Sequence, residues 1–519
     1  MVCIFKCYTQ LKKMKILFFA IIGLLFSSNS FSQQIHLDSL DLQIHQVIKD
    51  YEIPGLSIGI VRNDSIIFSK GYGNLEIHKE RKVDENTIFG IGSISKSFTA
   101  LTLGILVDEG KINWDDKVKD HLPYFELYSP YVTDNFTIRD LLTHRSGLKD
   151  VSGGTLWYHS DYPREEIIKR LKYLEPVSGF REKPAYQNVM YVVASEIVKT
   201  VSGMSWDNFV KTRVFDKLKM NNTTSLSAER ESNSNLAQPH IWNEDYEKVA
   251  IKQEKGDNLA PGGFIYSSSN EMSNYMRLLL NNGTFGNDTI VSQQIINEIF
   301  KPQIIYPIGG APFYNEFTSY GFGWWLTPKK GHKIIEHSGG IDGMSANLVM
   351  IKNMNLGFVI LTNEAEEPAT FLLTAKILEG LFDDESYDIY SRVMDYRNQN
   401  LKKKKESPVQ ISKTPKTKPS LEIQKYAGKY SDKMYGDILI NYTESGGLEI
   451  SFSHSPVFKG KLEHWHFDTF KIDWNDIRVP DGFLTFNFNS KREILGFSID
   501  QANLLDVDFG ELNILKNKN

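Results

Sequence analysis

The segment "GIGSISKSFTAL" (residues 90–101) contains a serine and a lysine whose spacing could support nucleophilic chemistry. Ser93 and Lys96 are three residues apart, so on a helix their side chains share one face and can meet. The segment continues into the apolar run "TLGILVDEG", which predicts a buried helix. Burial lowers the pKa of a lysine by desolvation, which favours its use as a proton acceptor. The pair therefore indicates a serine nucleophile beside its own base.

The spacing alone does not single out this pair. Ser146 and Lys149 repeat it in "THRSGLKD", a segment that is predicted to be a loop. Each residue of the first pair also has a structural interpretation, Ser93 as a helix-start residue and Lys96 as a lysine that extends its amine to water. The helical context favours Ser93 and Lys96, and Ser-x-x-Lys is a nucleophile pattern of penicillin-interacting serine enzymes.

With two further motifs, the segment resembles the class C serine β-lactamases and their esterase and D-peptidase relatives. Their second motif, Tyr-x-Asn, is matched by Tyr186 and Asn188 in "PAYQNVMYVVASEIV", just before a predicted helix. The same spacing recurs at Tyr72 and Asn74, but the order and context of the motifs favour the later pair. The resemblance extends from residue 38 to about residue 380.

The third motif of these enzymes is a small-residue turn on an edge strand. It reads Lys-Thr-Gly in the lactamases and often His-x-Gly in their relatives, and here it is matched by His337, Ser338 and Gly339 in "EHSGGIDG". A histidine in place of the lysine puts a neutral or partly charged ring where a carboxylate-binding cation would sit. This departure disfavours efficient β-lactam hydrolysis and leaves peptide, amide and ester substrates open.

The resemblance implies acyl transfer and a role for each matched residue. The Ser93 hydroxyl would attack a carbonyl, and Lys96 and Tyr186 would share the role of base. Tyr186 would carry protons to the leaving group, and Asn188 would orient a substrate amide or the lysine. The backbone amides of Ser93 and Gly340 match the family's oxyanion hole, in which each donor is typically worth roughly 10²–10³ in rate. The pattern does not assign the proton within the lysine–tyrosine pair.

The predicted elements are those of an α+β fold. A helix in "LDSLDLQIHQVIKDYEIPG" is followed by an antiparallel hairpin, "LSIGIV" and "SIIFSKGYG". Three more strands, "GHKIIEHSGG", "SANLVMI" and "LGFVILTNE", come much later, and the pattern between the two groups is mainly helical. We therefore predict one antiparallel sheet flanked by helices, with a helical lobe inserted, over residues 33–387. His144 and Arg145 in "LTHRSG" are interpreted as supporting rather than catalytic residues.

The end of the chain is predicted to be a separate all-β domain. Residues 388–421 are rich in lysine and proline and indicate a linker. Residues 422–519 contain short strand-like segments, the last of them "LLDVDFG" (504–510), and predict a small closed barrel. The domain is similar to the lipocalin-like module appended to this hydrolase family. His464 and His466 share a strand face, but no third ligand follows, so no metal site and no cofactor is predicted.

The start of the chain predicts export. Lysines precede the apolar run "ILFFAIIGLLF", and the polar stretch "SSNSFSQQ" ends it, a pattern typical of a signal peptide over residues 1–32. The run is shorter than the roughly 20 residues of a spanning helix, so no membrane span is expected after cleavage. Both cysteines precede this run, and the net charge of −5 does not favour nucleic acid. A periplasmic or secreted location follows.

The sequence as a whole predicts an exported serine hydrolase that acts through an acyl-enzyme. Its substrate would be a small molecule or peptide with a peptide, amide, ester or β-lactam carbonyl, and a D-amino-acid peptidase or esterase fits the motifs best. The alternative is a non-catalytic penicillin-recognising or peptide-binding protein, because a fold does not fix activity. The pattern contains no indication of the oligomeric state.

Overall fold

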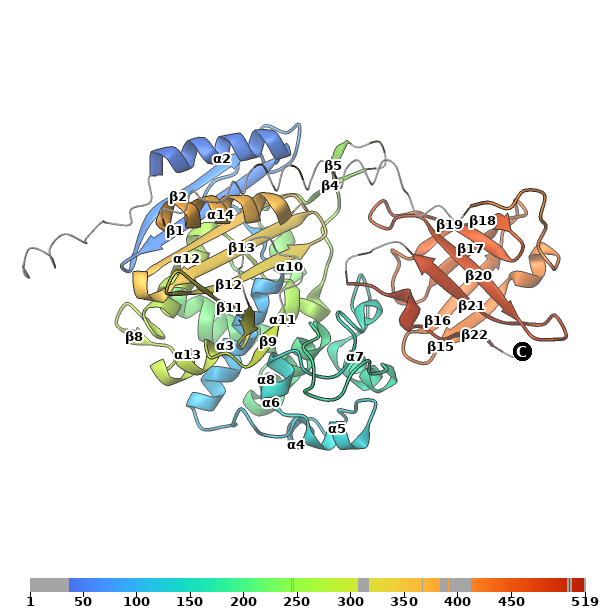
Figure 1. The fold of residues 1–519 in the computed structure, drawn as a ribbon, viewed down its shortest axis with the longest axis horizontal. Helices are drawn as coiled ribbons and strands as arrows, with labels where there is room; N and C mark the ends of the chain where they lie inside the picture. Colours follow the sequence, from blue (N-terminus) through green and yellow to red (C-terminus); the bar gives the residue numbers. More distant parts are fainter. Residues whose placement is uncertain are drawn as a thin grey trace, which may run out of the picture.

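The computed structural model describes residues 37–243, 245, 247–306, 317–365, 367–382, 391, 395, 399, 412–501, 504 and 506–517. Within them the chain forms an α+β domain with a central antiparallel sheet, followed by a closed β-barrel beside it (Figure 1). This confirms the predicted fold class. The predicted signal peptide (1–32) and most of the predicted linker (388–421) lie outside the described residues.

The central sheet has eight strands, and two adjacent interior strands, β1 and β14, come from the two ends of the domain. β1 pairs with β14, so that Leu56 lies opposite Thr362 and Arg62 opposite Leu356. Both strands are buried almost throughout, as expected when helices cover the two faces of a sheet. In spatial order the strands are β2 (Ser65–Gly73), β1 (Gly55–Arg62), β14 (Leu356–Thr362), β13 (Met344–Ile351), β12 (His332–Ile341), β11 (Trp325–Lys329), β10 (Thr318–Tyr320) and β9 (Ile304–Tyr306).

Two hydrophobic clusters occupy the two faces of this sheet. Helices α2 (Leu37–Tyr51) and α14 (Glu367–Phe382) cover one face (Figure 1). Their apolar side chains pack together with those of the sheet. The larger cluster fills the other face and extends into the helical lobe. The longer helices there are α3 (Ser95–Asp108), α8 (Val189–Ser202) and α12 (Ser269–Leu280).

The helical lobe combines buried long helices with several shorter elements. Its helices α3 and α8 are buried along most of their length and contact each other, as expected from the many apolar residues in both. None of the helices described has the length and apolar character needed to cross a bilayer. The shorter elements are α4 (Val118–His121), α5 (Pro130–Asn135), α6 (Ile138–Leu142), α7 (Arg164–Arg170), α9 (Trp206–Val210), α10 (Ser227–Glu231), α11 (Ala260–Gly263), α13 (Gln293–Ile299), β3 (Phe89–Gly90), β4 (His240–Trp242), β5 (Lys248–Ala250), β6 (Tyr266–Ser267), β7 (Thr284–Phe285) and β8 (Asp288–Thr289).

The strand that carries the third motif differs from its expected place at the edge of the sheet. β12 lies inside the sheet, because β11, β10 and β9 extend the sheet beyond it. Pairing with β11 runs only as far as Glu336, however, and from His337 to Ile341 the strand pairs with β13 alone. The motif therefore has an open backbone edge although its strand is internal.

The C-terminal domain is an eight-stranded antiparallel barrel that closes through β15 and β22 (Figure 1). Closure pairs every strand on both sides and removes exposed edges. Aromatic side chains fill the interior, including Tyr430, Phe486 and Phe497. The strands are β15 (Gly428–Asp432), β16 (Gly436–Tyr442), β17 (Leu448–Phe452), β18 (Lys459–His466), β19 (Thr469–Trp474), β20 (Gly482–Phe488), β21 (Ile494–Gln501) and β22 (Ile514–Lys516).

The prediction of the last barrel strand is wrong. The segment predicted as a strand (504–510) belongs to the connection between β21 and β22, and the closing strand is Ile514–Lys516. The alternation that suggested a strand has another cause: Phe509 packs on Phe458 and Trp474 in the barrel interior, whereas the acidic residues point to the hydrolase domain. The sequence analysis also did not predict β19 as a separate strand.

The same connection joins the barrel to the hydrolase domain. Gly153 N donates to Glu511 Oε2 at 2.9 Å, and Ser152 Oγ donates to the same carboxylate. Lys149 Nζ donates to Asp508. A second set of contacts includes a hydrogen bond of 2.7 Å between His454 Nδ1 and Asp161 Oδ1. Apolar side chains of the barrel and of the helical lobe belong to one buried cluster, so the two domains share a continuous interface.

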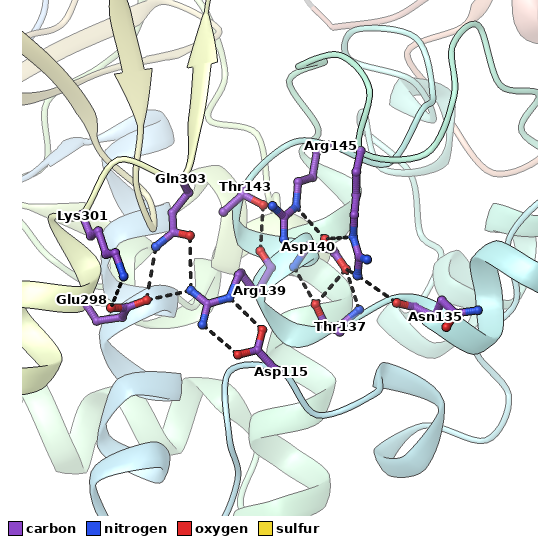
Figure 2. Close-up of polar contacts among 11 residues, drawn as sticks. Asp115, Asn135, Thr137, Arg139, Asp140, Thr143, Arg145, Glu298, Lys301 and Gln303 are labelled. Carbon is purple, nitrogen blue, oxygen red and sulfur yellow. Dashed lines mark hydrogen bonds and ion pairs between the residues drawn. The ribbon is translucent and has the colours of Figure 1, made fainter.

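A charged network fixes the loop that follows α6 (Figure 2). Asp140 is fully buried and accepts hydrogen bonds from Arg145 Nε at 2.6 Å and from Arg181 Nη2 at 2.6 Å, as well as from the Thr137 amide at 2.9 Å. The neighbouring Arg139 joins Asp115 to Glu298 and Gln303. Arg145, interpreted from the sequence as a supporting residue, thus anchors the segment that carries His144.

Replacing Asp140 by asparagine is expected to destabilise the protein by about 3 kcal/mol, because it breaks a buried ion pair and leaves two arginines without their carboxylate. A thermal melt measures this change as a lower midpoint temperature. Asp134→Asn is the matched control, since its carboxylate is more than half exposed and water screens its pair with Lys119, so the midpoint temperature should change little. Equal midpoints for the two variants would contradict the role assigned to Asp140.

Candidate active site

The predicted nucleophile lies at the junction between a strand and the buried helix. Ser93 is in a short 3-10 turn, Gly92–Ile94, directly before α3, and Lys96 is in the first turn of α3. Gly92 has a φ of +53°, a conformation that favours glycine, and a side chain there would collide with the amide of Gly340. The turn thereby leaves the Ser93 side chain half-exposed above a fully buried lysine.

The Lys96 amine connects the serine to two other segments. Its Nζ lies 3.0 Å from Ser93 Oγ, 2.7 Å from Asn188 Oδ1 and 2.6 Å from the Gly262 carbonyl oxygen. Burial lowers the pKa of Lys96 to about 7, and the charge of Asp506 acts in the opposite direction. A neutral amine can donate to Asn188 and Gly262 while its lone pair faces Ser93, which is the arrangement of a base beside a nucleophile.

Tyr186 and Asn188 approach this amine from the start of α8. Asn188 is the residue before the helix, and Lys96 Nζ lies 4.7 Å from the centre of the Tyr186 ring. Burial raises the pKa of Tyr186 well above its usual value, although hydrogen bonding with Ser93 lowers it. The surroundings thus favour the neutral forms of both the lysine and the tyrosine.

His144 supports Tyr186 from behind. Its buried ring accepts a hydrogen bond from the Gln187 amide at Nδ1, over 3.0 Å, and its centre lies 4.3 Å from that of Tyr186. Burial, with the nearby charges of Lys96 and His337, lowers the pKa of His144 well below its usual value. The ring is therefore neutral and can position the backbone of the Tyr-x-Asn motif without carrying charge.

His337 lies beside Tyr186 and not in the wall of the pocket at Ser93. The two ring centres are 6.3 Å apart, and the His337 Nε2 lies 2.9 Å from the Tyr320 hydroxyl. Burial lowers the pKa of His337 to about 3, and the charge of Lys96 acts in the same direction, so the ring is neutral at physiological pH. Ser338, the next motif residue, is exposed and accepts a hydrogen bond from His337 Nδ1 at its carbonyl oxygen.

Gly339 and Gly340 bring the open edge of β12 against the serine. A side chain at Gly339 would collide with the Ile91 carbonyl oxygen and approach the Ser93 amide. The backbone amides of Ser93 and Gly340 therefore lie close together, and Gly340 lines the same pocket as Ser93. Two backbone donors beside a nucleophile can stabilise the negative charge that develops on a carbonyl oxygen.

The pocket at Ser93 is a narrow cleft, with a cavity volume of about 20 Å³, and it is lined by residues that the sequence did not reveal. Ser93, Asn188 and Gly340 line it, together with the carboxylates of Glu254, Asp342 and Asp506. Asp506 comes from the barrel, and the Asn188 Nδ2 donates to its Oδ2 at 2.7 Å. No local pattern marks these three acids, because each belongs to a different loop.

Two of these acids join His159 in a group with the spacing of a cation site. The ligand atoms of His159, Glu254 and Asp342 lie within 4.8 Å of one another. The contacts within the group account for this arrangement, since His159 Nε2 lies 3.0 Å from Asp342 Oδ2 and the His159 amide donates to Glu254 at 3.0 Å. Burial raises the pKa of Glu254 to about 7, which weakens it as a metal ligand near neutral pH.

Comparison with known proteins gives matches to both domains of the chain. Residues 40–381 match the family model Beta-lactamase, and residues 412–515 match the model Domain of unknown function (DUF3471). Penicillin-binding protein 4* of Bacillus subtilis (strain 168) is 28% identical over 356 residues, which are 64% of this chain and 72% of that protein. Unguisins hydrolase ungD of Aspergillus violaceofuscus (strain CBS 115571) is 25% identical over 426 residues, which are 76% of this chain and 74% of that protein.

Solved structures share the fold over most of the chain. The octameric penicillin-binding protein homologue from Pyrococcus abyssi superposes with a TM-score of 0.62 at 21% identity, and the match covers 90% of this chain and 99% of the homologue. A penicillin binding protein from Bacillus halodurans gives a TM-score of 0.53 at 20% identity, over 64% of this chain and 98% of that one. The fold and the match over residues 40–381 confirm the resemblance seen in the motifs: the chain belongs to the beta-lactamase family.

Proposed function

We propose that the protein is a serine hydrolase that forms an acyl-enzyme on Ser93, with Lys96 as the base. The observation that carries this proposal is the 3.0 Å contact between Ser93 Oγ and the Nζ of a lysine whose pKa burial lowers to about 7. Membership in the beta-lactamase family, whose members are serine hydrolases, supports the same reaction class.

In the acylation step, Ser93 Oγ bonds to the substrate carbonyl carbon while its proton moves to the Lys96 Nζ. The amides of Ser93 and Gly340 stabilise the oxyanion. When the intermediate collapses, the bond from carbon to the leaving group breaks, and the leaving group receives a proton from the lysine through the Tyr186 hydroxyl. Tyr186 is suited to this relay because its hydroxyl hydrogen-bonds with Ser93, while burial raises its pKa and keeps it protonated.

Deacylation follows the same route in reverse. A water attacks the acyl carbon, its proton passes to the Tyr186–Lys96 pair, and the ester bond to Ser93 Oγ breaks as that oxygen regains a proton. Asn188 holds the lysine in place through its Oδ1 at 2.7 Å. The net reaction adds one water to a carbonyl compound and needs no oxidant, reductant or metal.

The substrates that fit best are peptides, amides or esters, as for D-amino-acid peptidases and esterases related to class C β-lactamases. A neutral His337 supports this choice, because it does not offer the cation that the lactamase lysine offers to a carboxylate. Export to the periplasm or beyond remains a prediction from the leader, which lies outside the described residues.

A fluorophosphonate should add its mass to the full-length protein at one site. Ser93→Ala should lose both this adduct and turnover, whereas its melting temperature should change little. Ser146→Ala is the matched control for the second Ser-x-x-Lys pair, in which Lys149 is exposed and pairs with Asp508. Intact-protein mass spectrometry decides the outcome: an adduct retained in Ser93→Ala, or none in the wild type, would overturn the proposal.

Lys96→Met removes the base while keeping a side chain of similar length. The rate of fluorophosphonate labelling should fall by about 10²–10⁴-fold, the usual contribution of general-base catalysis. Lys149→Met, the corresponding change in the second pair, should label at the wild-type rate. Intact-protein mass spectrometry of samples quenched at successive times measures both rates. An unchanged rate in Lys96→Met would exclude the lysine as the base.

A further inference from the structure

The barrel supplies a carboxylate to the hydrolase pocket. Asp506 lies in the connection between β21 and β22, and its side chain lines the pocket together with Ser93. Its Oδ2 accepts a hydrogen bond from Asn188 Nδ2 at 2.7 Å, whereas its Oδ1 has no hydrogen-bond partner among the described residues. The bonds of Asp508 and Glu511 to residues 149–153 hold this connection against the hydrolase domain.

Asp506 is connected to the nucleophile through a single residue. The Asn188 side chain accepts a hydrogen bond from Lys96 Nζ at Oδ1 and donates to Asp506 at Nδ2, each over 2.7 Å. Lys96 in turn contacts Ser93 Oγ at 3.0 Å. A group bound by Asp506 would therefore lie near the carbonyl that Ser93 attacks, and not at a remote part of a long substrate.

The charges around the pocket favour a cation. Its described lining contains the carboxylates of Glu254, Asp342 and Asp506 and no lysine, arginine or histidine side chain. Lys96 lies behind Ser93. The guanidinium of Arg478, whose charge lowers the pKa of Glu254, donates two hydrogen bonds to Asp476, at 2.8 and 2.5 Å. Burial raises the pKa of Asp506 and that of Glu254, so a protonated amine bound beside Asp506 would favour its charged form, whereas a substrate carboxylate would raise its pKa further.

Both oxygens of Glu254 contact His159, whereas Asp342 and Asp506 each keep one oxygen without a hydrogen-bond partner among the described residues, and Asp506 is the one of the two that is linked to Lys96 through Asn188. Tyr158 OH donates to Asp342 Oδ2 at 2.9 Å, and His159 contacts both Asp342 and Glu254.

We propose that Asp506 selects substrates whose acyl group carries a protonated amine close to the reacting carbonyl, such as an aminoacyl ester or a peptide with a free amino terminus. This inference rests on the proposed function, because it names the substrate class of the same Ser93 site. It makes the barrel part of the substrate-binding site, and Asp506 a specificity-determining residue.

The test compares alanine p-nitroanilide with its N-acetyl derivative, using both enantiomers and the full-length protein. The wild type should hydrolyse the free amine with a kcat/KM at least about 10-fold higher than that of the acetylated compound. Asp506→Asn should lower kcat/KM for the free amine by about 10- to 100-fold, the usual range for a hydrogen bond to a charged group. Hydrolysis of the N-acetyl compound should change much less.

Asp473→Asn is the matched control, because it removes one carboxylate from an exposed position of β19 in the same barrel. Its preference for the free amine should equal that of the wild type. Fluorophosphonate labelling of all three proteins provides a readout that needs no amine. Asp473→Asn should label at the wild-type rate, whereas any change in the labelling rate of Asp506→Asn, whose charge raises the pKa of Lys96, should affect both anilides equally. A lower melting temperature in Asp506→Asn would not explain a loss confined to the amine substrate.

The outcomes separate this inference from the proposed function. A wild-type protein without a fluorophosphonate adduct would contradict the proposed function itself. A labelled wild type that hydrolyses neither compound, or that shows no preference for the free amine, would overturn the inference alone. The same holds if Asp506→Asn keeps the wild-type preference or if Asp473→Asn loses it.

Discussion

The desolvation of one lysine is the constraint on which the rest of the site depends. Lys96 has no contact with bulk water, and its amine is surrounded by Ser93, Asn188 and the Gly262 carbonyl. Burying an ammonium is costly unless it is paired or loses its proton. The apolar helix α3 keeps water away, and the polar atoms from α8 and α11 orient the amine. Core packing thus holds the proposed nucleophile and its proposed base together.

The other parts of the fold bring distant segments to this amine. The sheet places the open edge of β12 against the turn at Ser93, and the charged network around Asp140 fixes the loop of His144, whose ring lies behind Tyr186. The barrel adds a carboxylate from the far end of the chain. The neutral His337 and the three acids that line the pocket underlie the proposed preference for a cationic substrate.

Much of this arrangement could be predicted from local sequence. Ser93 with Lys96 and Tyr186 with Asn188 are recognisable because spacing along one helix, or at its start, fixes which side chains meet. Asp506 could not be found this way, because it is 318 residues from its partner Asn188 and the alternation around it is that of a strand. The position of β12 inside the sheet was missed because β9 and β10 are only three residues long and have weak patterns.

The most direct test of the account is the pH dependence of Ser93 acylation, measured as the single-turnover rate of fluorophosphonate labelling. With a pKa of about 7, Lys96 is protonated at low pH and cannot accept the serine proton. The rate should therefore rise about tenfold per pH unit below 7 and level off above it, and Lys96→Met should lose this inflection. A wild-type rate that is flat between pH 5 and 9, or an inflection kept in Lys96→Met, would contradict the claim that a buried neutral lysine activates Ser93.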